Sequence, residues 1–540
     1  MPEYAFPDDR AEMATLDTSI YTHAWFDGSE WDLVTYNATL AAADTQQALS
    51  VQSSDDATKM WAREHDGVLN TEWFGVAVAN NSTAGGKNSP FLQAAFDMQA
   101  LVGFKLWTPR TSVPLEFDGS GTLTARGAAI AVRHQMSTWE CDAFLEWTSS
   151  TGVFFDLAPS DPEQSALIAP EWKIRRAYAS VMPNNEDDYS GSQFMIATRV
   201  INAKFKIRTD DFFRHYTTYG CTRWDTGNCE VYGNTLWPKN KAVKGSWFIC
   251  HDGYVFNDGT RRPAANMRHP GSEVTANDAT RKNMEVGILI RDMDGFWSDV
   301  SSYVGLAKVA DFRFIPSAPE AVLTNIILDG FKDGGPGRRV IDEEVVPSTT
   351  DNIVEFTEPS DGYMTGTCRA IEIRGILSGA AGSGVRLNIA NLSDIKISGI
   401  IKACTAYGIN WLKGSRLNVA GLCCYGNLAG DINNPDGRTL YGADAAMTDK
   451  SATIASFATF KVPALQDRFI ITGTNALQTI NGWWDRRVIT LVHEGAQLVR
   501  TTGNLRPEGG VEYQANSGDV SMWIYSASQS AWLQIAKSSN

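Results

Sequence analysis

The chain has 540 residues, of which 43% are hydrophobic and 20% charged, and its formal net charge is -15. This composition, with 46 glycines, is that of a folded, turn-rich β protein and excludes a disordered chain. The acidic balance argues against DNA or RNA as a partner, because nucleic-acid binding depends on clustered Lys and Arg. Neutral glycans remain compatible with this charge, whereas an anionic glycan would need a local basic patch.

Neither a membrane anchor nor a secretion signal is expected. Residues 1–13 contain four acidic residues and no apolar run, so we predict no signal peptide. No segment of 18 apolar residues occurs, so we expect no membrane insertion. The eight cysteines follow no regular pairing pattern, which indicates reduced, buried thiols in a protein made in a cytosol.

Residues 1–70 are predicted to form an N-terminal module. Residues 24–34 (AWFDGSEWDLV) are typical of a short hairpin that turns at Asp27-Gly28. Residues 40–60 are rich in Ala, Gln, Ser and Asp with spaced apolar positions, which fits a helix or a linker. Two interpretations of the module remain open, namely an exposed leader and a docking piece.

Residues 71–110 carry a helix signal between two short motifs. Trp73-Phe74-Gly75 precedes a polar loop, and Leu106-Trp107-Thr108-Pro109 follows the helix signal. Ser89 suits a helix N-cap and Pro90 suits the first helical position. We predict a helix that covers the open end of a β-stack. Its apolar stripe would consist of Phe91, Leu92, Ala95 and Phe96.

This order of motifs resembles the start of the pectate-lyase-like β-helix of bacteriophage tailspikes, in which a Trp-Phe-Gly segment leads into a capping helix. The resemblance implies a right-handed parallel β-helix with a cap helix, assembled as a homotrimer. It also implies a virion tail protein that docks on other tail proteins through its N-terminus and meets a host cell-surface polysaccharide. The loop at residues 76–88 lacks the acidic residues that the family often carries there, so we expect no role for such carboxylates.

The clearest periodicity lies within residues 369–424. The pattern Ile371, Ile373, Gly375, Ile376 recurs 24 residues later from Ile395 and again 22 residues after that from Leu417. A period of 20 to 25 residues built from short β-branched strands indicates a parallel β-helix. We extend this solenoid with loop excursions over residues 111–441.

Two further expectations follow from this period. The 45 residues from Ile326 to Ile371 are predicted to make two coils. The polar residues Glu372, Lys396 and Asn418 are predicted to form an outward column, which is either a binding stripe or a solvated surface.

The period ends before residues 442–540, which consist of short strands and turns. The motifs at 469–474 (FIITGT) and 487–491 (RVITL), followed by Trp532, resemble the small C-terminal β domain of phage tail and tailspike proteins. This resemblance implies a trimerisation or tip domain.

Two pairs of carboxylates are candidate catalytic residues, because hydrolysis of a glycan needs two acids that face one groove. Asp292 and Asp294 lie in the segment RDMDGFWSD, where a strand leads into an acidic turn beside two aromatic residues. Asp225 and Glu230 are the second pair. An Asp-Gly turn with solvated carboxylates is the alternative interpretation of the first pair, so depolymerase activity stays open.

Aromatic residues in and near a long excursion are candidate sugar contacts, since an indole offers a flat apolar face and one polar group. The same rings could instead fill the core or a subunit contact. Four neighbouring His and Cys residues match no common zinc pattern, so we expect no metal and no cofactor. The candidate glycan-binding residues are Tyr219, Trp224, Trp237, Trp247 and Trp297, and the His and Cys residues are His215, Cys221, Cys229 and His251.

Taken together, these inferences predict a phage tailspike or tail fibre that attaches the virion to a host surface polysaccharide. Whether the chain also cleaves this polysaccharide, as a glycoside hydrolase or as a lyase, remains open. The alternatives are an adhesin without enzymatic activity and a structural tail component.

Overall fold

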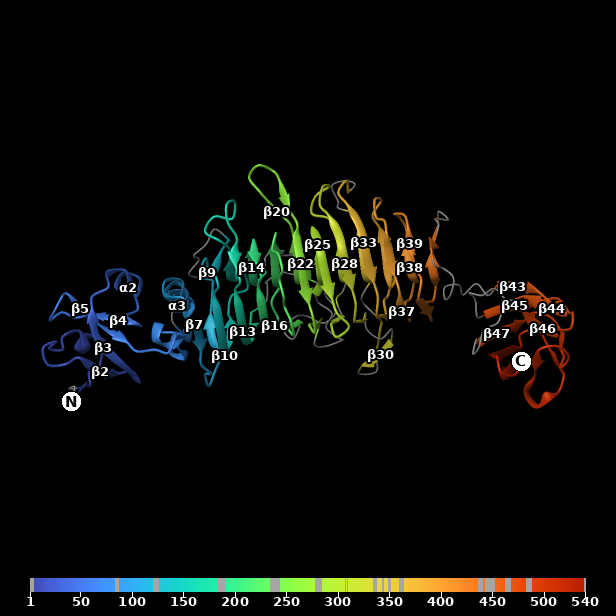
Figure 1. Ribbon diagram of the computed structural model, residues 1–540, viewed down its shortest axis with the longest axis horizontal. Coiled ribbons are helices and arrows are strands. Elements are labelled where there is room, and N and C mark those ends of the chain that lie inside the picture. Colours follow the sequence, from blue (N-terminus) through green and yellow to red (C-terminus); the bar gives the residue numbers. More distant parts are fainter. Residues whose placement is uncertain are drawn as a thin grey trace.

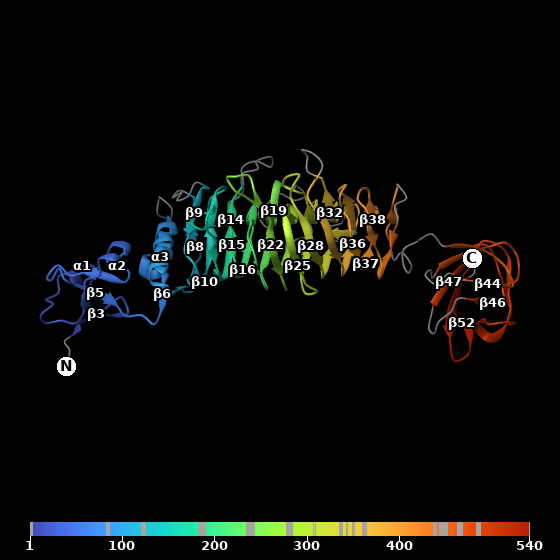
Figure 2. The same ribbon diagram turned by 45° about the horizontal axis from the view of Figure 1, so that its top comes forward.

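The computed structural model describes residues 4–538 except 83–86, 120–125, 182–190, 234–242, 277–283, 306, 308, 334–337, 342–343, 348–350, 359–363, 436–439, 442–451, 462–467 and 482–487. The molecule is elongated and mainly β, with an N-terminal module, a long shaft of stacked strands and a C-terminal domain beyond the far end (Figures 1 and 2). The three largest hydrophobic cores correspond to these three parts.

The N-terminal module is a small sheet with two short helices. The predicted hairpin is confirmed, because its two strands pair antiparallel and Asp27 and Gly28 adopt φ values of 53° and 68°, as a two-residue turn requires. The segment predicted as a helix or linker is instead part helix and part strand. The elements are β1 (Tyr4–Ala5), α1 (Arg10–Ala14), β2 (His23–Phe26), β3 (Ser29–Thr35), α2 (Ala38–Ala43), β4 (Ser50–Gln52) and β5 (Lys59–Arg63).

The predicted cap helix is α3 (Ser89–Val102), which packs on the first coils. Its Phe96 is fully buried, with its ring centroid 5.4 Å from those of Trp139 and Trp172. The N-cap is Asn88, one residue before the predicted Ser89. Its side chain accepts a hydrogen bond from the Ala77 N–H and donates one to the Glu116 carbonyl, so it does not cap the first turn of the helix. Around the helix lie β6 (Val68–Asn70), η1 (Thr71–Phe74), η2 (Val78–Ser82), β7 (Lys105–Thr108) and β8 (Leu115–Phe117).

We expect Phe96→Leu to lower the free energy of unfolding by about 1–2 kcal/mol, because it leaves a cavity between the cap and the two indoles. Urea unfolding measures this loss. Leu101→Ala, at an exposed position of the same helix, is the control and should change little. Equal losses in both variants would contradict the capping role of Phe96.

In the described part of the chain, the shaft consists of three parallel sheets that each gain a strand per coil. The 13-stranded sheet contains β6, β7, β8, β10 (Thr138–Trp147), β13 (Glu171–Ala179), β16 (Lys204–Asp210), β18 (Glu230–Gly233), β23 (Glu273–Ala276), β26 (Tyr303–Gly305), β29 (Phe331–Asp333), β34 (Ile376–Ser378), β37 (Gly399–Lys402) and β40 (Leu422–Tyr425). The 11-stranded sheet contains β9 (Ala128–Val132), β11 (Val153–Leu157), β14 (Gln193–Thr198), β17 (Arg214–Tyr219), β19 (Val243–Asp252), β24 (Met284–Ile290), β27 (Ala310–Phe314), β32 (Asn352–Thr357), β35 (Val385–Asn388), β38 (Tyr407–Trp411) and β41 (Gly430–Asn433). The seven-stranded sheet contains β22 (Ala264–His269), β25 (Met293–Ser298), β28 (Leu323–Leu328), β33 (Cys368–Ile373), β36 (Ile395–Ile397), β39 (Leu417–Asn418) and β42 (Leu440–Tyr441).

The predicted repeat register is confirmed. Ile371 pairs with Ile395 and Ile376 with Ile400, and these partners lie one coil apart. Inward residues such as Ile371 and Ile395 are buried and belong to one continuous core along the shaft. The mostly β architecture with stacked parallel strands is therefore that of a parallel β-helix.

The prediction of two coils between Ile326 and Ile371 is wrong. These residues pair directly across β28 and β33, so the 45 residues form a single coil. The extra length leaves the coil partly as a hairpin of β30 (Arg338–Ile341) and β31 (Glu344–Pro347). Two further small pairs are β12 (Leu167–Ile168) with β15 (Val200–Ile201), and β20 (Tyr254–Val255) with β21 (Arg261–Arg262).

The C-terminal domain has its own core around the buried Trp523 and Trp532, and the predicted short strands are confirmed. Six strands form its main sheet in the order β43-β45-β47-β51-β52-β49. The elements are β43 (Ala452–Ala455), β44 (Thr459–Lys461), β45 (Arg468–Thr472), β46 (Thr479–Asn481), β47 (Val488–His493), β48 (Gln497–Val499), β49 (Leu505–Arg506), η3 (Glu508–Gly510), β50 (Tyr513–Ala515), β51 (Val520–Ser526) and β52 (Ala531–Ser538).

All eight cysteines are free thiols, and seven of them are buried while Cys423 is exposed. Within the described residues, no helix combines the length and the apolar character needed to cross a membrane.

Candidate functional site

One outward column of side chains runs along the shaft. Neighbouring parallel strands lie about 4.8 Å apart, so the column presents one side chain at every coil. The predicted outward column of Glu372, Lys396 and Asn418 is confirmed, and it forms the last part of this longer column. Within it, Lys396 Nζ donates a hydrogen bond to Glu372 Oε1 at 2.9 Å. From coil to coil the column consists of Thr138, Glu171, Lys204, Asp225, Arg268, Trp297, Ile327, Glu372, Lys396 and Asn418.

The first seven positions of this column, from Thr138 to Ile327, line a continuous surface hollow, which we call the shaft groove. Its three parts enclose about 580, 480 and 370 Å³. The first and second parts share Lys204 and Asp225, and the second and third share Asn266 and Arg268. The groove side chains that reach the surface are Lys105, Thr138, Glu140, Glu171, Lys173, Asn202, Lys204, Lys206, Arg223, Asp225, Asn266, Arg268, Trp297, Asn325 and Ile327.

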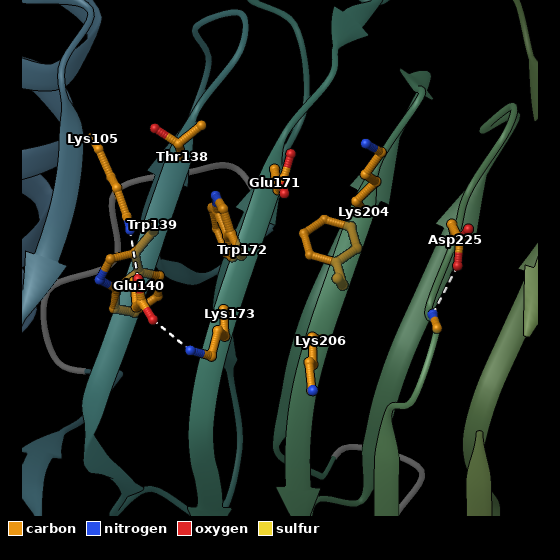
Figure 3. A pocket seen from close by; sticks show the side chains of 12 residues that line it. Lys105, Thr138, Trp139, Glu140, Glu171, Trp172, Lys173, Lys204, Lys206 and Asp225 are labelled. Atoms are coloured by element: carbon orange, nitrogen blue, oxygen red, sulfur yellow. Dashed lines mark hydrogen bonds and ion pairs between the residues drawn. The ribbon is translucent and has the colours of Figure 1, made fainter. Parts of the chain in front are cut away.

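At one end of the groove, two lysines from neighbouring strands hold one carboxylate (Figure 3). Lys105 Nζ and Lys173 Nζ each lie 2.5 Å from an oxygen of Glu140. Their hydrogen bonds lower the pKa of Glu140 to about 2, so this carboxylate is charged at neutral pH. Figure 3 also shows Lys204 and Lys206 on the next strand along the shaft.

At the other end, Trp297 offers a partly exposed indole. The Arg268 guanidinium lies 5.8 Å from the centroid of this ring. Asn266, Gly295 and Asn325 adopt positive φ at the same point of three successive coils, and all three line the hollow beside the indole, with an amide from each asparagine. A flat ring with a cation and amides nearby can hold a sugar ring through stacking and hydrogen bonds.

The structure places Asp292 and Asp294 in different surroundings. Asp292 is 1% exposed, accepts a hydrogen bond from the Val322 N–H at 2.9 Å, and pairs with Arg261 Nε at 3.1 Å. Burial raises the pKa of Asp292. Asp294 is exposed and accepts hydrogen bonds from the next coil, at Thr324 and Asn325. The two carboxylates therefore do not face one groove.

Asp225 and Glu230 also lie apart. Asp225 lines the shaft groove, where its Oδ1 accepts a hydrogen bond from the Gly227 N–H at 2.8 Å. Glu230 lies on β18, does not line the groove, and pairs with Arg208 of β16 at 3.4 Å. Of the four predicted catalytic residues, only Asp225 lines the groove.

The predicted sugar contacts have different environments. Trp224 is 1% exposed and packs against Phe205 in the core, as the core-filling alternative requires. Trp247 is partly buried on the 11-stranded sheet, where the Arg214 guanidinium lies 4.0 Å from its ring centroid. Trp297 lies in the shaft groove, and Trp237 lies outside the described residues.

A second hollow of about 680 Å³ lies beside the hairpin β20–β21 and contains Tyr219. It exposes polar groups that already pair with each other, since Arg291 lies 3.1 Å from Asp252 and Arg261 binds the buried Asp292. Asp252 also accepts a hydrogen bond from the Gly253 N–H. These carboxylates are anchored by guanidinium groups, which suits a structural role.

Sequence reasoning missed the cations of the groove, among them Lys173, Lys204, Lys206 and Arg268. A signal for two of them was available, because the alternation in KFKIR places Phe205 and Ile207 inward and both lysines outward. What the alternation did not indicate was that these lysines share a hollow with Trp297.

Fold and groove together define the protein as a parallel β-helix with a long lateral groove. No protein-family profile and no curated protein sequence matches the chain. Among solved structures, it is similar to the surface adhesin PfbA of Streptococcus pneumoniae (12% identity, TM-score 0.45, covering 69% of this chain and 99% of that one). It is also similar to a tailspike mutant of E. coli bacteriophage HK620 in complex with a pentasaccharide (12% identity, TM-score 0.39, covering 89% of this chain and 84% of that one).

A third similar structure is the tailspike gp49 of the Acinetobacter baumannii bacteriophage Fri1, a capsular polysaccharide depolymerase (11% identity, TM-score 0.32, covering 88% of this chain and 71% of that one). Phage tailspikes, the family that the sequence resembles, are thus among the solved structures to which this chain is similar.

Proposed function

We propose that this chain is a bacteriophage tailspike or tail fibre that attaches the virion to a host bacterial surface polysaccharide through the shaft groove. The shape and chemistry of the groove carry this proposal. It crosses successive coils, offers polar side chains along its length and has the Trp297 indole near one end, an arrangement that suits a chain of several sugars. The Trp-Phe-Gly and cap-helix motifs support the tailspike assignment.

The N-terminal module would dock on other tail proteins. Five of the large apolar side chains that stay exposed belong to the first 34 residues, including Phe6 at 73% and Trp25 at 48%. Exposed apolar residues gathered on one module are typical of a protein interface. We further propose that the chain forms a homotrimer and that residues 442–540 serve as its trimerisation or tip domain. Sedimentation of the purified chain as a monomer would contradict the homotrimer.

Two tryptophan variants separate the proposed roles. We expect Trp297→Ala to weaken binding of purified bacterial surface polysaccharide about tenfold or more, because it removes the apolar face of the groove, and to leave virion incorporation intact. The matched variant Trp25→Ala should keep polysaccharide binding and reduce incorporation. A panel of purified polysaccharides on a biosensor and the protein content of virions are the two measurements. Full binding by Trp297→Ala would contradict the groove assignment.

Cleavage of the bound polysaccharide is the second candidate function, and Asp225 is the acid that favours it, since it lies in the groove. Chromatography of the polysaccharide after incubation decides between the two. Shortened products that disappear in Asp225→Asn would make the chain a depolymerase, whereas binding without shortening would make it an adhesin.

A further inference from the structure

The shaft groove is locally basic although the whole chain is acidic. Six cationic side chains and three acidic ones line it, in a chain whose formal net charge is -15. The cations are Lys105, Lys173, Lys204, Lys206, Arg223 and Arg268, and the acids are Glu140, Glu171 and Asp225.

The three acids offset only half of the six positive charges, and two of them, Glu171 and Asp225, are the register neighbours of Lys204 on either side. Glu140 is shared by Lys105 and Lys173 at one end of the groove. Lys204 and Lys206 are both exposed on β16, and neither forms an ion pair with any residue that the structure describes. Lys206 also pairs in register with Lys173, and like charges directly opposite each other on neighbouring strands are unfavourable.

This charge continues toward the indole. Asp225 follows Lys204 in the outward column, but one of its oxygens is occupied by the Gly227 N–H. Arg268 comes next, exposed and close to the Trp297 ring. A ligand that lies along the groove would therefore meet the ammonium groups of Lys204 and Lys206, then the carboxylate of Asp225 beside the Arg268 guanidinium, and then the apolar face of Trp297.

We propose that the polysaccharide held by this groove is anionic, with an acid group bound between Lys204 and Lys206 and a neighbouring sugar on Arg268 and Trp297. This inference rests on the proposed function and narrows its ligand to polysaccharides that carry carboxylate or phosphate. A bound anion would relieve the repulsion between Lys206 and Lys173 and replace the missing acidic partners of both lysines of β16.

The test is a panel of purified acidic and neutral bacterial surface polysaccharides, presented to the full chain at low and high salt. We expect acidic members to bind, more weakly at high salt, and binding to be lost when their charge is removed. Chemical reduction of carboxyl groups and removal of phosphate with hydrofluoric acid distinguish the two sources of charge. The double variant Lys204→Gln/Lys206→Gln should bind about tenfold more weakly with a smaller salt dependence, while Lys204→Arg/Lys206→Arg should retain binding.

Lys396→Gln is the matched control, because Lys396 occupies the same outward column outside the groove. It should bind like the unmodified chain. The proposal of an anionic ligand would be overturned if charged and neutralised polysaccharides bound equally and the double Gln variant had no effect. If Trp297→Ala still lost binding, the proposed function would stand. Binding to no polysaccharide in the panel would overturn both.

Discussion

Replacing Gly399 by alanine is expected to lower the free energy of unfolding of the shaft by about 3–5 kcal/mol. Gly399 adopts φ +93°, and a Cβ atom there would lie 2.2 Å from the Gly375 carbonyl oxygen of the preceding coil. Gly375 stands in the same relation to Gly330, so the glycines of the repeat mark a close approach of backbones. Because that oxygen belongs to the backbone of a stacked coil, it cannot move aside without disturbing the register.

Gly421→Ala is the matched control for this prediction. Gly421 also has positive φ, at +77°, but the nearest atom to its added Cβ would be Ser398 Cβ at 3.9 Å. Only the backbone strain of about 1–2 kcal/mol then applies. Thermal and urea unfolding of both variants compare the two costs, and equal destabilisation would show that backbone contact between coils does not explain the glycine.

Acidification from pH 7.5 to pH 5 is expected to destabilise the protein strongly, because three buried imidazoles must stay neutral in the folded state. Burial lowers the pKa of His215 and His269 to about 3 and that of His251 well below its usual value. The Nε2 atoms of His251 and His269 lie 2.8 Å apart, so they share a single proton.

The direction of the effect follows from these lowered pKa values. Above about pH 6.5 the histidines are neutral in both folded and unfolded chains, and stability is unaffected. Below it the unfolded chain binds protons that the folded chain does not, so each buried imidazole costs about 2 kcal/mol at pH 5.

The melting temperature between pH 7.5 and pH 5 measures this effect. The His215→Asn variant places an amide where the imidazole Nδ1 bonds Thr209. The number of protons taken up on unfolding sets the slope of stability against pH, and in this variant it should fall by about one. An unchanged slope in this variant would contradict the role of His215. The window lies above the range in which Glu140, whose pKa is lowered to about 2, takes up its proton.

Sequence reasoning predicted the shaft best where the coils are short. Between Ile371 and Leu422 the strict alternation and the glycines define each rung, and the strand pairing follows the predicted register. The long coil before Ile371 was predicted wrongly, because a count of residues cannot distinguish an additional coil from a hairpin that leaves the shaft.

The site was harder to predict than the fold. Tryptophan alone does not reveal which face of a strand it occupies, and Trp224 proved to lie in the core while Trp297 lies in the groove. The groove joins Lys105 to Trp297 through strands far apart in the sequence, so no local motif contains it. Asp292 shows the same limit, since its burial depends on Arg261 and Val322 of other segments.

The most direct test of the account is a crystal structure of the full chain with an oligosaccharide derived from a polysaccharide that it binds. We expect sugar density along the shaft groove, across Lys204 and Lys206 and against the Trp297 indole. Density confined to the C-terminal domain or to the hollow beside Asp252, with an empty shaft groove, would contradict it.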